Sequence, residues 1–380
     1  MPETPDAELP ALPLPEGVRS RMVPGVNGLA VHLLEAGFET PGRPLVLLLH
    51  GFPELAFSWR HVLPALAAAG FHAVAPDQRG YGRTTGWDAR YDGDVGSFRM
   101  LNLARDALGL VMALGYRQVH TVVGHDFGSP VAAWCAVVRP DVFQRVVLMS
   151  APFAGPPALP FNTAGRPAAA KAVDVHTALA ALPRPRKHYQ WHYATPGANA
   201  EMLQAPQGVH ALLRAYYHHK SADWPGNQPE PLRGWTADEL ARLPTYYVMD
   251  LQAGMADTVA PHMPTPAQIA ANRWLPDAAL RVYSGEFSRT GFQGGLNWYR
   301  CSIGEAYQAE LQLFAGRHID VPSLYIAGRA DWGTYQKPGG FEAMQDSACT
   351  RLRGVHLVDG AGHWVQIGRA SCRERVSLNV

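Results

Sequence analysis

The chain has 380 residues, of which 47% are hydrophobic and 17% are charged, and its formal net charge at neutral pH is +1. A chain of this length can bury a large core and exceeds the usual size of one domain, so we expect one core domain plus an insertion. A net charge near zero leaves no electrostatic footprint for nucleic acid or an anionic membrane surface, and we expect neither as a partner.

No apolar run reaches the roughly 18 residues that span a bilayer, and the first residues lack the basic-then-apolar order of a signal peptide. The four cysteines, Cys135, Cys301, Cys349 and Cys372, show no C-x-x-C spacing, which argues against a zinc site or a disulfide framework. Free thiols fit a reducing compartment. The sequence therefore predicts a soluble, cytoplasmic protein that binds no metal.

Strands and short turns alternate along the first part of the chain, after an arm over residues 1–17 that carries five prolines and that we expect to be flexible. Each of three apolar runs ends in a motif typical of a strand that leads into a turn and a helix. The run 45–49 precedes His50-Gly51-Phe52-Pro53, the run 73–76 precedes D-Q-R-G-Y-G (77–82), and the run 119–123 precedes G-H-D-F-G (124–128).

Asp126 stands at the centre of the G-H-D-F-G motif. Small residues on both sides allow a strained strand-to-helix turn that presents one side chain to a pocket, as in the G-x-S-x-G nucleophile elbow. Here the presented group is a carboxylate, which is ionised at neutral pH and needs no base to become a nucleophile, because its ordinary pKa is about 3.9. The alternative is that Asp126 only caps the following helix. The pattern indicates alkyl transfer to a carboxylate.

This order of strands and motifs resembles the α/β-hydrolase superfamily, and within it the branch with an aspartate nucleophile, which comprises epoxide hydrolases and haloalkane or fluoroacetate dehalogenases. The resemblance extends from Arg19 to Gln366. It implies an α/β fold, with a mostly parallel central sheet flanked by helices and a mainly helical cap insertion. The expected division is the arm 1–17, a hydrolase core at 18–153 and 312–366, a cap at 154–311 that includes helices over 201–219 and 236–243, and a tail at 367–380.

Two later strands supply the other members of the triad that the resemblance implies. Asp331 lies just past the run 321–328, and His363 follows the run 355–358. Catalytic groups collect at the carboxyl ends of parallel strands, and the order nucleophile, acid, histidine is that of the fold. We therefore expect His363 to be the base and Asp331 to orient it.

Other acids and histidines compete for these roles. Asp320 precedes its strand, Asp346 falls in a helical stretch, and Asp359 is too close in sequence to face His363. The strand 146–150 is followed by Ala-Pro-Phe, with no carboxylate. Among the histidines, we expect His125 to support the site from a second layer and the pair His218-His219 to be solvated.

The resemblance also implies an oxyanion hole formed by the backbone N–H groups of Phe52 and Phe127, and a cis bond before Pro53. The segments 187–193 and 294–300 resemble those that supply two cap tyrosines, here Tyr189 and Tyr299, with Tyr193 as the alternative to Tyr189. Two phenols suit an epoxide, since the alkoxide formed on ring opening must be hydrogen-bonded and protonated.

The sequence thus predicts an epoxide hydrolase, a hydrolase acting on ether bonds that uses no cofactor. Asp126 would form a hydroxyalkyl ester, and water activated by His363 would hydrolyse it to a diol. We expect a small hydrophobic epoxide as substrate, water as co-substrate, a monomer or homodimer, and a role in detoxification or biosynthesis. The residues expected to bind substrate are His50, Pro53, Trp191, Trp298, Phe292 and Trp364.

Two alternatives remain. A haloalkane or haloacid dehalogenase would need side-chain donors for the halide at positions 52 and 127, or an arginine near the elbow, but phenylalanine stands at both positions. The second alternative is a protein that has the hydrolase fold but has lost catalysis and only binds ligands, since fold alone does not establish catalysis.

The last stretch, 367–380, departs from the family pattern of a long amphipathic terminal helix. Its sequence looks like one reading frame of a sequencing adapter, so we expect it to be non-native and leave it out of fold reasoning.

Overall fold

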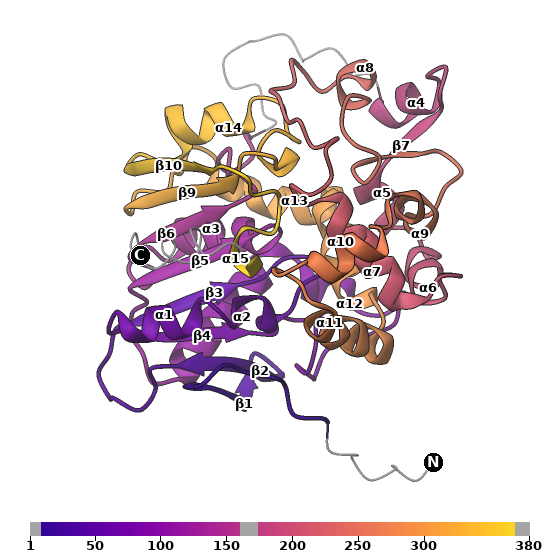
Figure 1. The fold of residues 1–380 in the computed structure, drawn as a ribbon. Coiled ribbons are helices and arrows are strands. Elements are labelled where there is room, and N and C mark those ends of the chain that lie inside the picture. Colours follow the sequence, from indigo (N-terminus) through magenta and orange to yellow (C-terminus); the bar gives the residue numbers. More distant parts are fainter. Residues whose placement is uncertain (1–8, 160–173, 369–380) are drawn as a thin grey trace, which may run out of the picture.

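The computed structural model describes residues 9–159 and 174–368. In these residues, eight strands form a central sheet in the order β1-β2-β4-β3-β5-β6-β9-β10 (Figure 1). The two pairings β1-β2 and β2-β4 are antiparallel, and the remaining pairings are parallel. The strands are β1 (Val18–Val26), β2 (Leu29–Ala36), β3 (Leu45–Leu49), β4 (His72–Pro76), β5 (Thr121–His125), β6 (Val146–Met149), β9 (Ser323–Gly328) and β10 (Leu352–Val358). The predicted α/β architecture with a mostly parallel sheet is confirmed.

The central strands form because their side chains are apolar on both faces. All five residues of β3, Leu-Val-Leu-Leu-Leu, are buried, as expected for a parallel strand covered by helices on both sides. Helix α3 packs on β5 and β6, and α1 packs on β4 and β2. The helices of this part are α1 (Leu63–Ala68), α2 (Met100–Ala113), α3 (Gly128–Val138), α14 (Gly340–Ala343) and α15 (Val365–Gly368).

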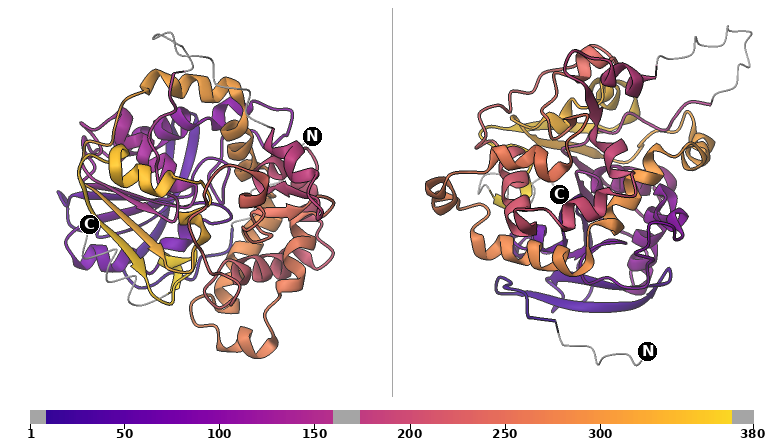
Figure 2. Two further views of the ribbon diagram at one scale, coloured as in Figure 1. Left: turned by 90° about the horizontal axis from the view of Figure 1, so that it is seen from above. Right: turned by 90° about the vertical axis from the view of Figure 1, so that its right-hand side faces the viewer.

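Between β6 and β9 the chain leaves the sheet and forms a set of helices that we call the inserted helices, α4 to α13. They group mainly on one side of the sheet (Figures 1 and 2), with a small antiparallel pair, β7 (Arg186–His188) and β8 (Val248–Asp250). Their bounds are α4 (Val175–Ala180), α5 (Tyr189–Tyr193), α6 (Ala198–Leu203), α7 (Gly208–His219), α8 (Ala237–Leu240), α9 (Met255–Val259), α10 (Pro266–Ala271), α11 (Asp277–Thr290), α12 (Gln293–Ile303) and α13 (Glu305–Leu311).

Two local expectations for this region were wrong. The helix expected over 201–219 is split into α6 and α7, because the intervening residues include Pro206, which has no N–H to continue a helix. The helix expected over 236–243 is the single turn α8. At the other end of the chain, α15 crosses the boundary expected at residue 367, and Ile367 is fully buried. The rest of the stretch for which the sequence predicted a non-native tail, 369–380, lies outside the described residues.

The D-Q-R-G-Y-G turn after β4 is fixed by the buried carboxylate of Asp77. It accepts hydrogen bonds from the backbone N–H groups of Ala56 and Arg83 at 2.8 and 3.0 Å and contacts His32 at 2.7 Å. Gly82 takes a φ of +51°, and a Cβ there would lie 2.2 Å from the Asp77 carboxylate. This glycine is therefore required by a close approach as well as by its backbone conformation.

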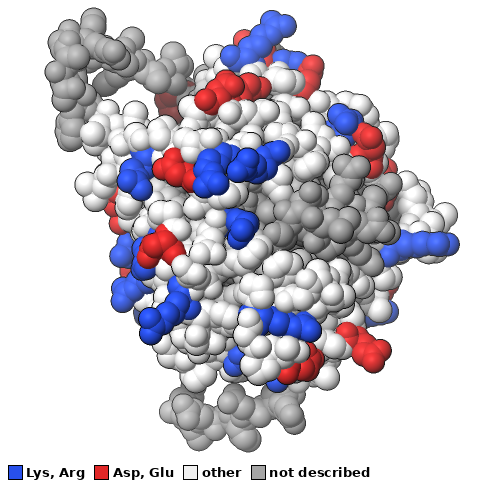
Figure 3. All heavy atoms as spheres, turned by 90° about the vertical axis from the view of Figure 1, so that its left-hand side faces the viewer, with Lys and Arg blue, Asp and Glu red and all other residues white. Residues whose placement is uncertain are grey.

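The surface carries mixed charge. On the face shown in Figure 3, basic side chains lie beside acidic ones, in keeping with the formal net charge of +1. Within the described ranges, no helix is both long enough and apolar enough to cross a membrane.

A buried ion-pair network closes the β1-β2-β4 edge of the sheet. The side chain of Glu35 on β2 is fully buried and accepts hydrogen bonds from Arg19 at 2.8 Å and Arg21 at 2.5 Å, and it contacts His72 Nε2 at 2.8 Å. Burial works to raise the pKa of Glu35, but the hydrogen bonds from His72, Arg21 and Arg19 outweigh it and lower the pKa to about 2.

Replacement of Glu35 by glutamine should lower the free energy of unfolding by about 3 kcal/mol at neutral pH, because it removes a buried charge that Arg19, Arg21 and the hydrogen-bonded His72 stabilise. Since the pKa is lower in the folded protein than its ordinary value of 4.5, this stabilisation is complete above about pH 4.5 and is lost as the pH falls towards about 2. Thermal unfolding from pH 7 to pH 3 should therefore show the two proteins converging in acid. Glu39→Gln, on the exposed loop after β2, is the control; equal curves for both variants would contradict the assignment.

Candidate active site

Asp126 lies at a sharp turn between β5 and α3 with a φ of 50°, in the left-handed region that only glycine adopts easily. The turn is possible because glycines surround it. A Cβ on Gly124 would lie 2.0 Å from the carbonyl oxygen of Gly128, and one on Gly51 would lie 2.4 Å from the Cβ of Asp126. The strand-to-helix elbow expected from the sequence is thus present, and Asp126 does more than cap a helix.

Asp126, His363 and Asp331 come together although they lie far apart in the chain. His363 Nδ1 is 3.0 Å from Asp331 Oδ1, and His363 Nε2 is 3.1 Å from Asp126 Oδ2. All three side chains are at least nine-tenths buried. The contact with Asp331 is a regular hydrogen bond, whereas Nε2 is close to Asp126 without being aligned for one. The imidazole is therefore oriented from one side, and its other nitrogen keeps the capacity to bind a further group.

The backbone N–H of Phe52 donates a hydrogen bond to Asp126 Oδ1 at 3.0 Å, and the Phe52-Pro53 peptide bond is cis as expected. Phe127 follows Asp126 directly, and its ring packs edge-on against Trp298 and Tyr299. The Phe52 N–H thus already contacts the atom on which negative charge would develop if an ester of Asp126 were attacked.

Electrostatics keep the three groups ionisable in spite of their burial. Burial works to raise the pKa of Asp126, but His363 and the charge of Lys220 outweigh it and hold this pKa below its ordinary value. Burial and Lys220 work to lower the pKa of His363, but Asp331 and Asp126 outweigh them, so this pKa is raised. Burial opposes the ionisation of Asp331 as well, and His363 lowers its pKa. Asp126 is therefore ionised at neutral pH.

Sequence reasoning missed Lys220. It is buried at the end of α7, with its ammonium 4.9 Å from the ring centre of Tyr247 and 5.5 Å from that of Trp364. Its carbonyl oxygen accepts a hydrogen bond from the backbone N–H of His363 at 3.0 Å. No motif marks this lysine, since its place beside His363 follows only from the packing of α7 on the last loop.

Sequence reasoning also missed Glu54 and Gln366, which support the site through buried hydrogen bonds. Glu54 accepts a hydrogen bond from the N–H of Gly51 at 3.0 Å, contacts His125 Nδ1 at 2.6 Å and accepts one from Gln366 at 2.5 Å. His125 Nε2 lies 2.8 Å from the carbonyl oxygen of His363. His125 is thus in the supporting layer as expected. The available signal for Glu54 was its position directly after H-G-F-P.

The main cavity next to Asp126 has a volume of about 240 Å³ and is bordered by both tyrosines, Tyr189 on α5 and Tyr299 on α12. Their ring centres are 5.7 Å apart. Burial, and after it the charge of Asp126, raises the pKa of each phenol well above its ordinary value. Both hydroxyl groups are therefore protonated donors. The alternative, Tyr193, is not among the described residues that line this cavity.

The hydroxyl of Tyr189 is held by two amides that the sequence did not single out. It donates to Gln336 Oε1 and accepts from Gln190 Nε2, each at 3.2 Å. The hydrogen bond from Gln190 works to lower the pKa of Tyr189, although burial outweighs it. A phenol with an amide donor on its oxygen gives up its proton more readily than one without.

None of the six residues expected to bind substrate is among the described residues that line the cavity beside Asp126: His50, Pro53, Trp191, Phe292, Trp298 and Trp364. Trp298 donates its indole N–H to the carbonyl oxygen of Arg79 at 2.9 Å, and Trp364 donates to that of Tyr217 at 2.7 Å. Phe292 is fully buried. A role of these side chains in substrate binding stays a prediction.

The pair His218-His219 is a further correction, since both are buried instead of solvated. The ring of His219 stacks on that of His262 with their centres 3.5 Å apart. Burial, and then the charges of His262 and His218, lowers the pKa of His219 to about 2. The pair lies on α7, which contacts α11, α9 and the turn Ala260–His262.

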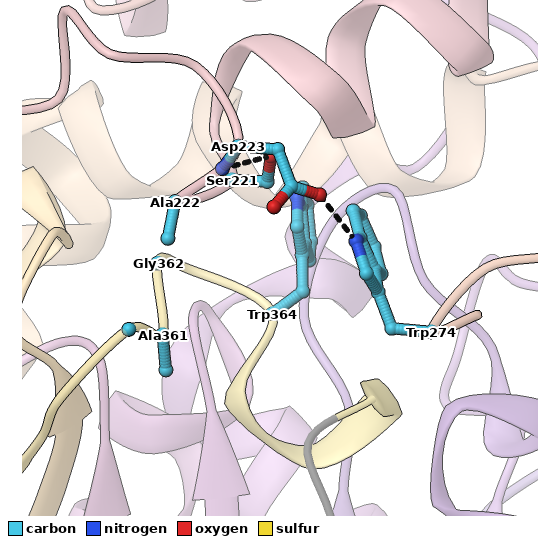
Figure 4. A pocket seen from close by; sticks show the side chains of 8 residues that line it. Ser221, Ala222, Asp223, Trp274, Ala361, Gly362 and Trp364 are labelled. Atoms are coloured by element: carbon cyan, nitrogen blue, oxygen red, sulfur yellow. Dashed lines mark hydrogen bonds between the residues drawn. The ribbon is translucent and has the colours of Figure 1, made fainter. Parts of the chain in front are cut away.

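A second, much smaller cavity of about 20 Å³ lies beside the His363 loop (Figure 4). Its wall includes Asp223, Trp274, Gly362 and Trp364, and Asp223 accepts the indole N–H of Trp274 at 2.7 Å. Asp126 does not border it, so this space is separate from the reacting groups. Within the described ranges, no cluster of three His, Cys, Asp or Glu side chains is arranged to hold a metal ion.

Comparison with known proteins places this geometry in a family. The model of the alpha/beta hydrolase fold family matches residues 44–189. Epoxide hydrolase A of Mycobacterium tuberculosis is 33% identical over 354 residues, which cover 92% of this chain and 93% of that protein. An epoxide hydrolase of Caballeronia sordidicola is 31% identical, over 90% of this chain and 87% of that protein.

Solved structures agree. An epoxide hydrolase from an endophytic Streptomyces superimposes with a TM-score of 0.73 at 33% identity, covering 96% of this chain and 95% of that one. Epoxide hydrolase A from Mycobacterium thermoresistibile gives a TM-score of 0.69 at 31% identity, over 95% and 97% of the two chains. The chain therefore has the α/β-hydrolase fold and belongs to the epoxide hydrolase family.

Replacement of Glu54 by alanine should destabilise the protein by about 3 to 5 kcal/mol, because it leaves His125 and the N–H of Gly51 buried without their partner. Thermal unfolding should show this loss, and Glu342→Ala, an exposed glutamate on α14, should unfold as the parent does. If the two variants unfold alike, Glu54 does not support the turn that carries Phe52.

Proposed function

We propose that the protein hydrolyses epoxides to vicinal diols through an ester formed on Asp126. The observation that carries the proposal is the buried array of Asp126, His363 and Asp331 beside a cavity that two tyrosines also border. A nucleophile, an oriented base and two hydroxyl groups that can donate hydrogen bonds are the set that opening an oxirane and hydrolysing the resulting ester requires.

In the first step, the Asp126 carboxylate attacks the less hindered oxirane carbon. The carbon–oxygen bond breaks, and its electron pair stays on the ring oxygen, where Tyr189 and Tyr299 donate hydrogen bonds. Tyr189 leaves Gln336 to do so, while Gln190 continues to donate to the phenol oxygen and stabilises it as its proton moves to the alkoxide. The products of this step are an ester of Asp126 and a free hydroxyl group.

In the second step, His363 takes a proton from water, and the hydroxide adds to the ester carbonyl carbon. The N–H groups of Phe52 and Phe127 hold the resulting oxyanion. The intermediate collapses, and the departing alkoxide takes the proton from His363 to complete the diol. The proton of the resulting Asp126 carboxylic acid passes to the Tyr189 phenolate left by the first step, so Asp126 returns as a carboxylate and Tyr189 as a phenol. Formation of the ester also changes the pKa of His363, because the ester of Asp126 carries no charge. One of the two carboxylates that raise the pKa of His363 is then gone, and the neutral base is favoured.

The inserted helices act as a cap in this proposal, since α5 and α12 carry the tyrosines and shield the ester from bulk water. We assign residues 18–153 and 312–366 to the catalytic core and 154–311 to this cap. We place the enzyme in the cytoplasm, where the buried free thiols of Cys135, Cys301 and Cys349 would stay reduced, and infer a role in detoxification.

Dehalogenation is less well supported. The positions from which side chains would hold a halide are Phe52 and Phe127, which have no polar hydrogen to donate. The indole N–H of the nearby Trp298 is already used by Arg79. A protein of this fold that had lost catalysis and only bound ligands would not require an ionised carboxylate, an oriented base and two protonated phenols at one cavity.

His363→Gln should still form the ester but fail to hydrolyse it. Incubation with styrene oxide should then give a protein heavier by one substrate molecule, with the added mass on the peptide that contains Asp126. Asp126→Asn is the control that should stay unmodified. In the parent protein, a single turnover in water enriched in heavy oxygen should label Asp126 and leave the diol largely unlabelled. Label found directly in the diol would rule out the ester.

Asp331→Asn should slow hydrolysis of the ester by a factor on the order of 10² to 10⁴ and move the acid limb of its pH profile to lower pH. The base must be neutral, so the rate falls as the pH drops through the pKa of His363, and the asparagine removes a charge that raises this pKa. The decay of preformed ester, followed from pH 5 to pH 9, measures both effects. Asp359→Asn, in the loop that leads to His363 but exposed and paired with Arg329, should change neither.

A further inference from the structure

One part of the active-site cavity differs from the rest of its wall. Around Asp126 much of the lining is apolar, with contributions from Pro130, Trp134 and Phe153. Three polar side chains border the same space. Gln336 and Lys337 are consecutive in the loop after β9, and Gln190 comes from α5. The cavity therefore suits a molecule with an apolar body and a polar end.

Lys337 is the charged member of this polar wall. Its side chain is accessible, as expected for a group that faces an open cavity. In the part of the chain that the structure describes, no carboxylate acts on Lys337. Lys337 thus borders the cavity without an acidic partner from the described protein. A substrate that carries a negative charge would supply one.

The loop that carries Lys337 also fixes its place relative to the chemistry. Asp331 Oδ1 accepts the N–H of Gly333 at 2.8 Å, and three residues later Gln336 accepts the hydroxyl of Tyr189 at 3.2 Å. Lys337 is the next residue. The loop that carries Asp331, the partner of the base, thus also carries two residues of the cavity wall.

Charge decides the orientation of such a substrate. Asp126 is the one carboxylate that the described residues contribute to the cavity wall, and it is ionised. It repels a second anion at short range, whereas Lys337 attracts it. A molecule with one oxirane and one carboxylate would therefore bind with its carboxylate at the polar wall and its ring at Asp126.

We propose that Lys337 is a specificity-determining residue that selects epoxides carrying a carboxylate, or another anionic group of similar charge, at the end remote from the oxirane. This inference rests on the proposed epoxide hydrolysis and adds the substrate class.

The test compares two substrates of nearly equal shape, para-carboxystyrene oxide and para-carbamoylstyrene oxide, which differ in charge. The parent protein should prefer the carboxylate in kcat/KM. Lys337→Gln should reduce that preference by up to about fivefold, the size expected for an accessible ion pair, mainly by raising KM. Lys337→Arg should keep the preference. Lys187→Gln, which removes the same charge from β7 beside α5 but does not border the cavity, should also keep it.

The outcomes separate the two proposals. A thermal unfolding curve of Lys337→Gln that matches that of the parent protein shows that the variant is folded, and the ratio of the two para-substituted substrates cancels any effect common to both. An unchanged ratio of the two para-substituted substrates in Lys337→Gln would overturn the role of Lys337 while epoxide hydrolysis stands. If no epoxide is turned over, calorimetric binding of the two corresponding diols still tests the charge preference, and equal affinities for them would overturn it.

Discussion

The close approach of three backbone segments around Asp126 is the constraint on which the rest of the site depends. The turn after β5, the turn after β3 and the start of α3 meet where Gly51, Gly124 and Gly128 leave no room for a Cβ. This packing holds Asp126 at a left-handed φ of 50°, a conformation that costs on the order of 1 to 3 kcal/mol. The surrounding buried sheet maintains it, and in return the carboxylate lies directly against the N–H of Phe52.

Mutual charge stabilisation is what makes this buried site reactive. Burial alone would favour neutral forms of Asp126, Asp331 and His363, and it is the contacts among them and with Lys220 that keep the carboxylates ionised. The Glu35 network at the sheet edge uses similar chemistry, a buried carboxylate with basic partners. There, however, every partner is fixed within the fold, so the same physics gives stability without a reaction.

The inserted helices and the loop after β9 act on the site together. Tyr189 comes from α5 and the amide that accepts its hydroxyl from the loop of Asp331, so a motion of the helices relative to the sheet would change the direction of the phenol. Lys220 makes a comparable link, since α7 carries it and its carbonyl oxygen binds the backbone of His363. The two parts of the molecule are thus joined at the reacting groups and not only at their surfaces.

The sequence by itself determined the parts that have local causes. The apolar runs predicted the central strands, the glycines around Asp126 predicted the elbow, and the order of motifs placed Asp331 and His363 at strand ends, where the structure brings them together. Only the tertiary structure decided which side chains face the cavity. Trp298 and Trp364 belong to the expected motifs but bind backbone carbonyls, while Lys220 and Lys337 reach the site from segments without a recognisable pattern. The direction of a side chain depends on the packing of distant segments, and no local spacing encodes it.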